Sequence, residues 1–312
     1  MMKNNPRSIH VAGDFFMPHQ TGQTISGLDA ELERANHALL HSLNHECGAH
    51  TQLTRALHHH FNAGGGRVRM VLALDAGRRL GLPNNDRLHL ALATELLHNA
   101  SLIHDDLQDQ DPVRRGQPAV WHAYGTDVAI LAGDFLLATA FGQLAHCTRQ
   151  VPALLQHFQK RSADLIFGQA HDLSHDERPD NFSLETYRQI VSAKSGALLA
   201  MPLELPLIAS GHTQTMARAQ AAGRAFAIAY QISDDLSDIE ADARHDCFNI
   251  VHALLRSGHP DAMHAAITEG QLQCQKAIEN ACLLPDHCGE LMVERAQRLM
   301  TDFQQTEETQ IS

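Results

Sequence analysis

Aromatic residues are scarce in this chain of 312 residues, where they make up 5% of the sequence and include a single tryptophan. β-Branched residues do not alternate with polar ones over any useful length, as they do in half-buried strands. The abundant residues are alanine, leucine, glutamine, arginine and glutamate, which favour helices. These features argue against a sheet-based fold and predict an all-α protein.

Basic residues are also few, since 24 lysines and arginines face 36 aspartates and glutamates for a net charge of -12. This balance argues against a nucleic-acid-binding surface. The six cysteines are scattered, with no CxxC pair and no Cys/His spacing typical of a metal site. We therefore expect reduced thiols and a cytoplasmic location.

Long apolar runs are missing as well. The first ten residues, MMKNNPRSIH, contain no apolar core of a signal peptide. The most apolar stretch, from Val128 to Leu144, is interrupted by Asp134 and is short for a membrane span. We expect a soluble protein with no membrane span.

The chain divides into an N-terminal arm and one long helical region. Residues 1–26 are polar and aperiodic, which predicts a flexible arm. The helical pattern then continues almost to the end, and no linker rich in Ser, Gly or Pro separates two halves. We therefore expect residues 27–312 to form a single helical domain.

Two long helices are predicted most clearly. The first covers about residues 86–109 and ends before Pro112, which cannot continue a helix. Its apolar stripe consists of Leu88, Leu92, Leu96 and Ile103. The second covers about residues 215–242, with a stripe of Ala217, Ala221, Ala225, Ile228 and Ile232. The small alanines predict close packing against neighbouring helices.

Both helices carry three aspartates at the C-terminal end. The two clusters are Asp105, Asp106 and Asp109, and Asp234, Asp235 and Asp238. Like charges at this spacing cost a few tenths of a kcal/mol per pair, and at a helix C-terminus each opposes the helix dipole by roughly 0.3–1 kcal/mol. One such cluster could be a solvated helix end. Two copies favour a site for Mg²⁺, which prefers carboxylate oxygens and shares its other positions with water and phosphate.

Basic residues occur near the first cluster and in two other segments. Arg114 and Arg115 follow the helix-ending proline, where their planar guanidinium groups could bind phosphate oxygens. The glycine run 64–66 could bind a second anion through its backbone N–H groups, although this signal is weak by itself. Lys194 is one of four lysines in the chain and could be a phosphate contact or simply a solvated residue.

Taken together, these motifs resemble the polyprenyl synthetase family of trans-isoprenyl diphosphate synthases from about residue 30 to residue 250. The matching segments are GGGRVR at 64–69, ELLHNASLIHDDLQDQD at 95–111, RRG at 114–116, YGTDVAILAGDFLLATAF at 124–141, GQAHDL at 168–173, KSG at 194–196 and QISDDLSD at 231–238. The resemblance implies a single-domain isoprenoid synthase fold, with antiparallel helices around a deep central cavity, and a homodimer.

The resemblance also implies a role for each matching residue. The six aspartates would bind three Mg²⁺ ions on the diphosphate of an allylic substrate. The contacts to that diphosphate or its metal shell would come from Arg114, Lys194, Ser195 and Gln231. The second substrate, isopentenyl diphosphate, would be held by Arg69, His98 and Arg115. The implied reaction ionises the allylic diphosphate and then condenses it head-to-tail with isopentenyl diphosphate.

The chain departs from the family pattern at two places. Gly66 stands where the family's glycine motif has a lysine, and no lysine occurs between Lys194 and Lys276, where the family has two. Losing a charge-assisted contact costs about 1.5–3 kcal/mol unless another group replaces it. Arg67 and Arg244 are candidates for that replacement.

Product length is expected to depend on Ala100 and Ser101, which lie about one helical turn before Asp105. In the family, a bulky aromatic at these positions stops growth at fifteen carbons. The small residues here predict geranylgeranyl diphosphate as the product, with farnesyl diphosphate or a longer product as the alternatives. The alternative readings are a class I terpene cyclase, which usually has one DDxxD motif, and a non-catalytic partner subunit, which should have lost aspartates.

Overall fold

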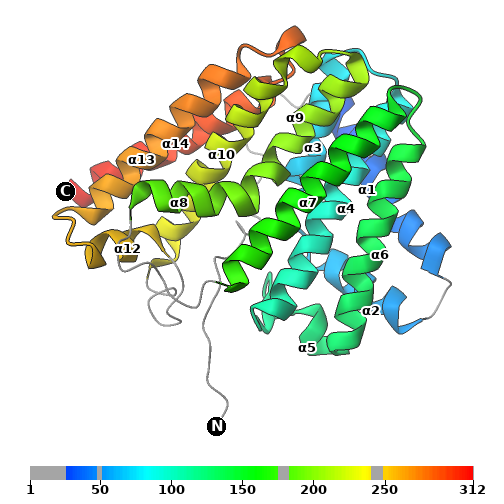
Figure 1. Cartoon of the computed structure of the whole chain (residues 1–312), viewed down its shortest axis with the longest axis horizontal. Coiled ribbons are helices and arrows are strands. Elements are labelled where there is room, and N and C mark those ends of the chain that lie inside the picture. Colours follow the sequence, from blue (N-terminus) through cyan, green and yellow to red (C-terminus); the bar gives the residue numbers. More distant parts are fainter. Residues whose placement is uncertain (1–25, 48–50, 175–182, 240–248, 312) are drawn as a thin grey trace. The chain divides into compact units, whose positions relative to one another are not determined.

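The computed structural model describes residues 26–47, 51–174, 183–239 and 249–311, and these are almost entirely helical (Figure 1). The predicted N-terminal arm, apart from Ser26, lies outside the described residues. The helices are α1 (Ser26–Cys47), α2 (Gln52–Asn62), α3 (Val68–Arg79), α4 (Asn84–Gln108), α5 (Val120–Tyr124), α6 (Thr126–Ala145), α7 (Val151–Ser174), α8 (Leu184–Val191), α9 (Ala197–Ser210), α10 (Met216–Ser237), α12 (Ile250–Arg256), α13 (Ala262–Ala281) and α14 (Glu290–Ile311). The predicted all-α class is confirmed.

Short elements connect some of these helices. A π-helix, η1 (Ser192–Gly196), leads directly from α8 into α9, and two 3₁₀ turns cover Thr213–Thr215 and Pro285–His287. The only strands among the described residues are β1 (Val113–Arg114) and β2 (Gln117–Pro118), which pair antiparallel. Arg115 and Gly116 form the turn between them, with φ of 52° and 73°. Two successive positive φ angles are typical of a type I′ hairpin turn, and the glycine adopts them readily.

The chain divides into two compact units. The N-terminal unit contains the described residues up to Phe158 together with Leu205–Gly211, and the C-terminal unit contains Gln159–Glu204 together with the described residues from His212 onward. Helices α7 and α9 therefore contribute residues to both units. The single domain expected for residues 27–312 stays a prediction.

Helix α4 is the central element of the N-terminal unit, where it packs against α3 and α6. It agrees closely with the helix predicted over residues 86–109. Residues 90–100 are buried on every side of the helix, so its buried surface is wider than the predicted stripe. A helix that is buried all round is held in place by its neighbours, which fixes the position of the aspartates at its C-terminal end.

In the C-terminal unit, α10 packs against α13, and α13 packs against α14 (Figure 1). Helix α10 packs closely against α9 at Gly223, where an added Cβ atom would overlap the Cα atom of Ala200. The predicted stripe of small residues is only partly buried, because Ala225 is buried but Ala221 is half-buried and Ala217 is exposed. Helix α10 ends at Ser237, five residues before the predicted end at residue 242. At this end Asn249 Nδ2 donates to the Asp235 carbonyl at 2.6 Å and thereby satisfies one of the helix's last four carbonyls from outside the helix.

Two described stretches are long and apolar enough to cross a membrane, namely Thr126–Ala145 and Leu184–Ser210. The first is helix α6, whose 20 residues correct our argument that this run is too short. The apolar windows are 44% and 78% buried, and core helices of soluble proteins meet the same criteria of length and composition. The absence of a membrane span stays a prediction.

Candidate active site

The first aspartate cluster lies on the last turn of α4. Asp105 and Asp106 are buried, with 6% and 1% of their surfaces exposed, and Asp109 is the C-cap of the helix. The Asp109 N–H donates to the Asp105 carbonyl at 2.8 Å. Asp105 and Asp109 are therefore separated by one turn on the same side of the helix, as the sequence predicted.

Arg114 binds the second aspartate of this cluster. Its Nε donates to Asp106 Oδ1 at 2.9 Å, and its Nη2 also contacts this oxygen. Burial raises the pKa of Asp106 to about 6, although Arg114 acts in the opposite direction. Burial by itself would lower the pKa of Arg114, but the charge and hydrogen bonds of Asp106 outweigh it and raise this pKa. Strand β1 of the hairpin thus carries one cationic side chain directly beside the cluster.

Arg115 connects the same hairpin to the glycine loop before α3. Its Nη1 donates to the Gly64 carbonyl, and its guanidinium group lies against Gly65. Gly65 has φ of +138°, and an added Cβ atom there would lie 2.9 Å from Arg115 Cζ. The φ angle favours glycine, and any larger residue would also displace the end of the Arg115 side chain. Burial lowers the pKa of Arg115 to about 10, so the side chain remains cationic at neutral pH.

Arg69 and His98 form a buried pair in the same unit. Arg69 Nη1 donates to His98 Nε2 at 3.0 Å, and the side chains are 4% and 2% exposed. Burial, followed by the charges of Arg69 and Arg114, holds the pKa of His98 well below its usual value. His98 is therefore neutral, with Nε2 as acceptor and a proton on Nδ1. That Nδ1 is buried and has no hydrogen bond among the described residues, which leaves a donor available to a ligand.

Arg67, a candidate to replace the lysine missing at position 66, already contacts two other side chains. It forms an ion pair with buried Glu95 at 3.2 Å, and its guanidinium carbon lies 5.2 Å from the centre of the Phe61 ring. This bond uses only Nη1, and the Glu95 carboxylate already offsets part of the charge that Arg67 could offer a diphosphate. The other candidate, Arg244, lies outside the described residues.

The residues predicted to govern product length are both on α4. Ala100 is 3% exposed. Ser101 is half-buried, and its hydroxyl donates to the His98 carbonyl at 2.8 Å within the same helix. Both side chains are small. Their effect on product length stays a prediction.

The second cluster lies at the end of α10, in the C-terminal unit. Asp234 is half-buried and Asp238 exposed, whereas Asp235 is 3% exposed. Asp235 accepts hydrogen bonds from the Tyr187 hydroxyl at 3.0 Å, from Gln231 Nε2 at 2.8 Å and from the Ile250 N–H at 2.8 Å. Three donors compensate for the cost of burying this carboxylate.

Lys194 and Ser195 lie in the π-helix η1 and are each 2% exposed. The η1 segment packs against α8 and α10. A π-helical turn inside a longer helix frequently marks a functional site, which agrees with the roles expected for these two residues. We did not predict this irregular turn from the sequence.

Two residues that contact the second cluster were missed from the sequence. Tyr187 lies seven residues before Lys194, so a helical spacing of two turns could have drawn attention to it. Asn249 is the N-cap of α12, and its Oδ1 accepts from the Val251 N–H at 2.9 Å. The Asn-Ile-Val sequence is typical of a helix start, but nothing in it indicates a contact with α10.

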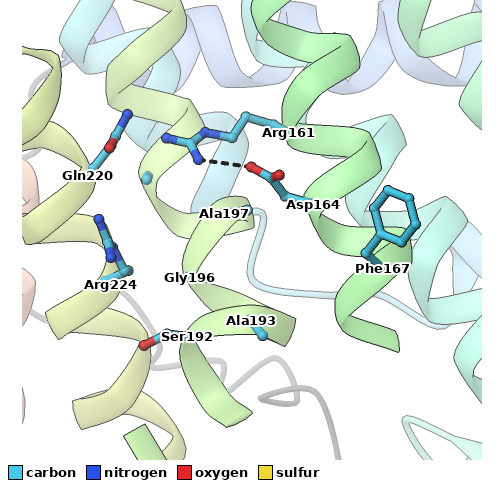
Figure 2. A pocket seen from close by; sticks show the side chains of 10 residues that line it. Arg161, Asp164, Phe167, Ser192, Ala193, Gly196, Ala197, Gln220 and Arg224 are labelled. Atoms are coloured by element: carbon cyan, nitrogen blue, oxygen red, sulfur yellow. Dashed lines mark hydrogen bonds and ion pairs between the residues drawn. The ribbon is translucent and has the colours of Figure 1, made fainter. Parts of the chain in front are cut away.

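A pocket of about 390 Å³ lies in the C-terminal unit (Figure 2). Its lining includes small residues, among them Gly196 and Ala200. On one wall, Arg161 pairs with Asp164, as Figure 2 shows, and with buried Glu204. None of the predicted site residues lines this pocket, so it is not the predicted diphosphate site.

The carboxylates suit a magnesium ion that brings its own additional ligands. Among the described residues, no three His, Cys, Asp or Glu side chains converge on a preformed metal centre. Asp106 Oδ2 is buried and accepts no hydrogen bond from this part of the chain, so it keeps lone pairs for an ion. Mg²⁺ usually binds through one or two carboxylates and completes its shell with water and phosphate oxygens. The donor set fits that pattern.

Comparisons with known proteins identify the family. Residues 50–246 match the sequence profile described as Polyprenyl synthetase. The chain is 36% identical over 193 residues to a short chain isoprenyl diphosphate synthase of Methanothermobacter thermautotrophicus, which covers 61% of this chain and 59% of that protein. It is 34% identical over 248 residues to a nonaprenyl diphosphate synthase of Mycobacterium tuberculosis, covering 74% and 72% of the two chains.

The structure resembles the geranylgeranyl pyrophosphate synthetase of the archaeon Geoglobus acetivorans, with a TM-score of 0.77 and 25% identity. That match covers 88% of this chain and 99% of the other. By sequence, the matched part spans about three fifths of the length of the first curated relatives, 59% and 61%. The profile match and the structural match agree, and the chain belongs to the polyprenyl synthetase family.

Proposed function

We propose that the protein is a Mg²⁺-dependent head-to-tail trans-prenyltransferase that condenses an allylic diphosphate with isopentenyl diphosphate. The observation that carries the proposal is the N-terminal unit's grouping of Asp105 and Asp106 with a cationic side chain, Arg114, at hydrogen-bonding distance. Carboxylates for a metal and a guanidinium for phosphate oxygens are the two kinds of group that a metal–diphosphate complex needs. The names of the relatives support the same activity.

The substrate-binding residues divide into two sets in this proposal. Arg114, Lys194, Ser195 and Gln231 bind the allylic diphosphate, and Arg69, His98 and Arg115 bind isopentenyl diphosphate. His98 is neutral and donates from Nδ1, so it contributes a hydrogen bond rather than a charge. Bound Mg²⁺ supplies neutralisation of the negative charge that grows on the departing diphosphate. The six aspartates of the two clusters are the proposed ligands, with three ions per site.

The chain's own residues orient the two substrates for carbon–carbon bond formation. The allylic C–O bond breaks, the isopentenyl double bond forms the new C–C bond, and a proton leaves to the released diphosphate. Fixed cationic donors stabilise the charge that develops on the leaving group, which is an electrostatic contribution that needs no reorganisation. The proposed product is geranylgeranyl diphosphate, and we propose a cytoplasmic homodimer.

Product analysis tests the activity. The protein with Mg²⁺ and farnesyl diphosphate should give geranylgeranyl diphosphate only when isopentenyl diphosphate is also present. A hydrocarbon or alcohol formed from farnesyl diphosphate alone would identify a terpene cyclase instead. No product in either reaction, together with stimulation of a related synthase, would identify a non-catalytic partner subunit.

A further inference from the structure

A closed set of side-chain contacts links α2, α4 and the start of α3 in the N-terminal unit. His60 Nε2 lies 2.9 Å from Asn99 Oδ1, and Asn99 Nδ2 donates to Glu95 Oε1 at 3.1 Å. The same Glu95 oxygen accepts from Arg67 Nη1 at 3.2 Å. The Arg67 guanidinium carbon lies 5.2 Å from the centre of the Phe61 ring, and Phe61 follows His60 in α2. We call these five residues the Asn99 network.

The network is buried and its carboxylate has few donors. His60, Glu95 and Asn99 are 3%, 2% and 0% exposed. Glu95 Oε2 is buried and accepts no hydrogen bond from the described part of the chain. The bonds from Asn99 and Arg67 to Oε1 therefore compensate for the burial of this charge. Removing either donor would leave a buried carboxylate with a single partner, which is unfavourable.

The Asn99 amide fits this position in one orientation. Its Nδ2 also donates to the Glu95 backbone carbonyl at 2.8 Å, so it faces two acceptors. A flipped amide would place Oδ1 against both of them. In the observed orientation Oδ1 accepts from His60, whose Nε2 therefore carries the proton. A neutral His60 agrees with its pKa of about 4, which burial lowers.

The other end of the network determines how α3 begins. Arg67 is the N-cap of this helix, with φ of 47° and ψ of 30°, a left-handed conformation that is unfavourable for a residue with a side chain. Its carbonyl accepts from the Val71 N–H at 2.9 Å, so its position sets the first turn of α3, which carries Arg69. Arg115 binds the same loop at the Gly64 carbonyl. Two residues assigned to isopentenyl diphosphate therefore depend on where this loop lies.

We propose that Asn99 is a positioning residue of the isopentenyl diphosphate site, because it holds Glu95 and thereby Arg67 at the start of α3. This inference rests on the proposed function. His98, a third residue assigned to this substrate, directly precedes Asn99 in α4. The network contains none of the residues assigned to the allylic diphosphate. Its loss should weaken the binding of one substrate and spare the other.

The test is the dissociation constant of isopentenyl diphosphate, measured by titration calorimetry without an allylic substrate so that no reaction occurs. Asn99→Leu removes both functions of the amide at similar volume. We expect the dissociation constant to rise about tenfold, as for the loss of one hydrogen bond to a charged group. In steady-state kinetics the KM for the allylic substrate should stay within about twofold of the wild type, which a general loosening of the fold would not allow.

Thr148→Val is the matched control. Thr148 Oγ1 donates at 2.9 Å to Asp86, another buried carboxylate of α4. Asp86 lies thirteen residues before Asn99, which is about 20 Å along the helix. The control therefore removes a donor from a buried carboxylate on the same helix without touching the Asn99 network. It should leave the dissociation constant unchanged.

A second variant tests the route through Arg67. Arg67→Gln should also raise the dissociation constant, and the double variant with Asn99→Leu should bind no more weakly than the weaker single variant, because both changes release the same ion pair. Multiplied effects in the double variant would mean that Asn99 does not act through Arg67, and would overturn the inference. If Asn99→Leu does not fold, as judged by circular dichroism, Asn99→Ser is the smaller change that also removes the amide.

An unchanged dissociation constant in a folded Asn99 variant would overturn the inference, as would an equal rise in the KM for the allylic substrate. The proposed function fails in a different way. In that case the wild type gives no binding heat with isopentenyl diphosphate and no product with Mg²⁺ and farnesyl diphosphate. The two failures are therefore distinguishable in one series of measurements.

Discussion

Arg115 lies directly over Gly65, and its guanidinium group binds the carbonyl of Gly64. This contact joins the hairpin turn to the glycine loop within the N-terminal unit. Gly65→Ala should therefore destabilise the protein by about 1–3 kcal/mol, because the new Cβ meets Arg115 and the φ of +138° is unfavourable for alanine. Urea unfolding measures this change. Gly81→Ala, a glycine with positive φ but no close neighbour, is the control and should lose less.

The missing lysine at Gly66 gives a kinetic prediction. Because Arg67 is paired with Glu95, we expect a high KM for isopentenyl diphosphate in the wild type. Gly66→Lys should lower this KM by about tenfold, since a charge-assisted contact contributes about 1.5–3 kcal/mol. Steady-state kinetics with varied isopentenyl diphosphate tests it. If Gly66→Lys lowers only the KM for the allylic substrate, the assignment of position 66 to the isopentenyl diphosphate site is wrong.

Removing one carboxylate of the first cluster should stop the reaction without unfolding the protein. We expect Asp105→Asn to lower kcat by about 10²–10⁴-fold, because stabilisation of the leaving group depends on this site. Circular dichroism should show the wild-type helical content. In addition, Mg²⁺ with pyrophosphate should raise the melting temperature of the wild type more than that of the variant, since ligands stabilise only the state they bind. If Asp105→Asn keeps the wild-type kcat, this cluster has no part in the reaction and is only a solvated helix end.

The small side chain of Ala100 predicts the product length. Ala100→Phe should shorten the product from geranylgeranyl to farnesyl diphosphate, because an aromatic ring takes the space expected for the growing chain. Chromatography of the products formed from geranyl diphosphate measures the shift. Ala91→Phe, a buried position on α4 far from the cluster, controls for the cost of overpacking this helix. Farnesyl diphosphate as the sole wild-type product would contradict this assignment.

The lowered pKa of buried His60 predicts that the protein loses stability in acid. Burial lowers its pKa from 6.5 to about 4, although a hydrogen bond to Asn99 acts in the opposite direction. Between these values the unfolded chain binds a proton that the folded chain excludes, so stability present above pH 6.5 is lost as the pH falls towards 4. Between pH 7.5 and 5 the loss from His60 should be about 2 kcal/mol.

Urea unfolding of His60→Gln at both pH values isolates this contribution. The variant should lose about 2 kcal/mol less than the wild type over the same range. His122→Gln, at an exposed position, should follow the wild type. Equal losses in all three proteins would mean that His60 takes up its proton in the folded state as readily as in the unfolded chain.

Local sequence patterns predicted much of the fold and much of the first cluster. The α4 helix and its aspartates follow from apolar periodicity and from Pro112, which act over a few residues. The contact at the end of α10 could not be predicted in this way, because Asn249, which satisfies the Asp235 carbonyl, comes fourteen residues after it. Two ion pairs, Arg114 with Asp106 and Arg67 with Glu95, likewise depend on how separate elements pack. The apolar periodicity of the sequence gives no information about such contacts.

The discontinuous N-terminal unit has a consequence for biosynthesis. This unit includes Leu205–Gly211, so it is incomplete when Phe158 leaves the ribosome. At about 5–20 residues per second, synthesis of residues 159–211 takes about 3–10 s, during which the core around α4 lacks its last segment. The buried side chains of Leu205, Leu207 and Ile208 are missing from the unit for that time. The nascent chain is therefore expected to depend on ribosome-associated chaperones until Gly211 has emerged.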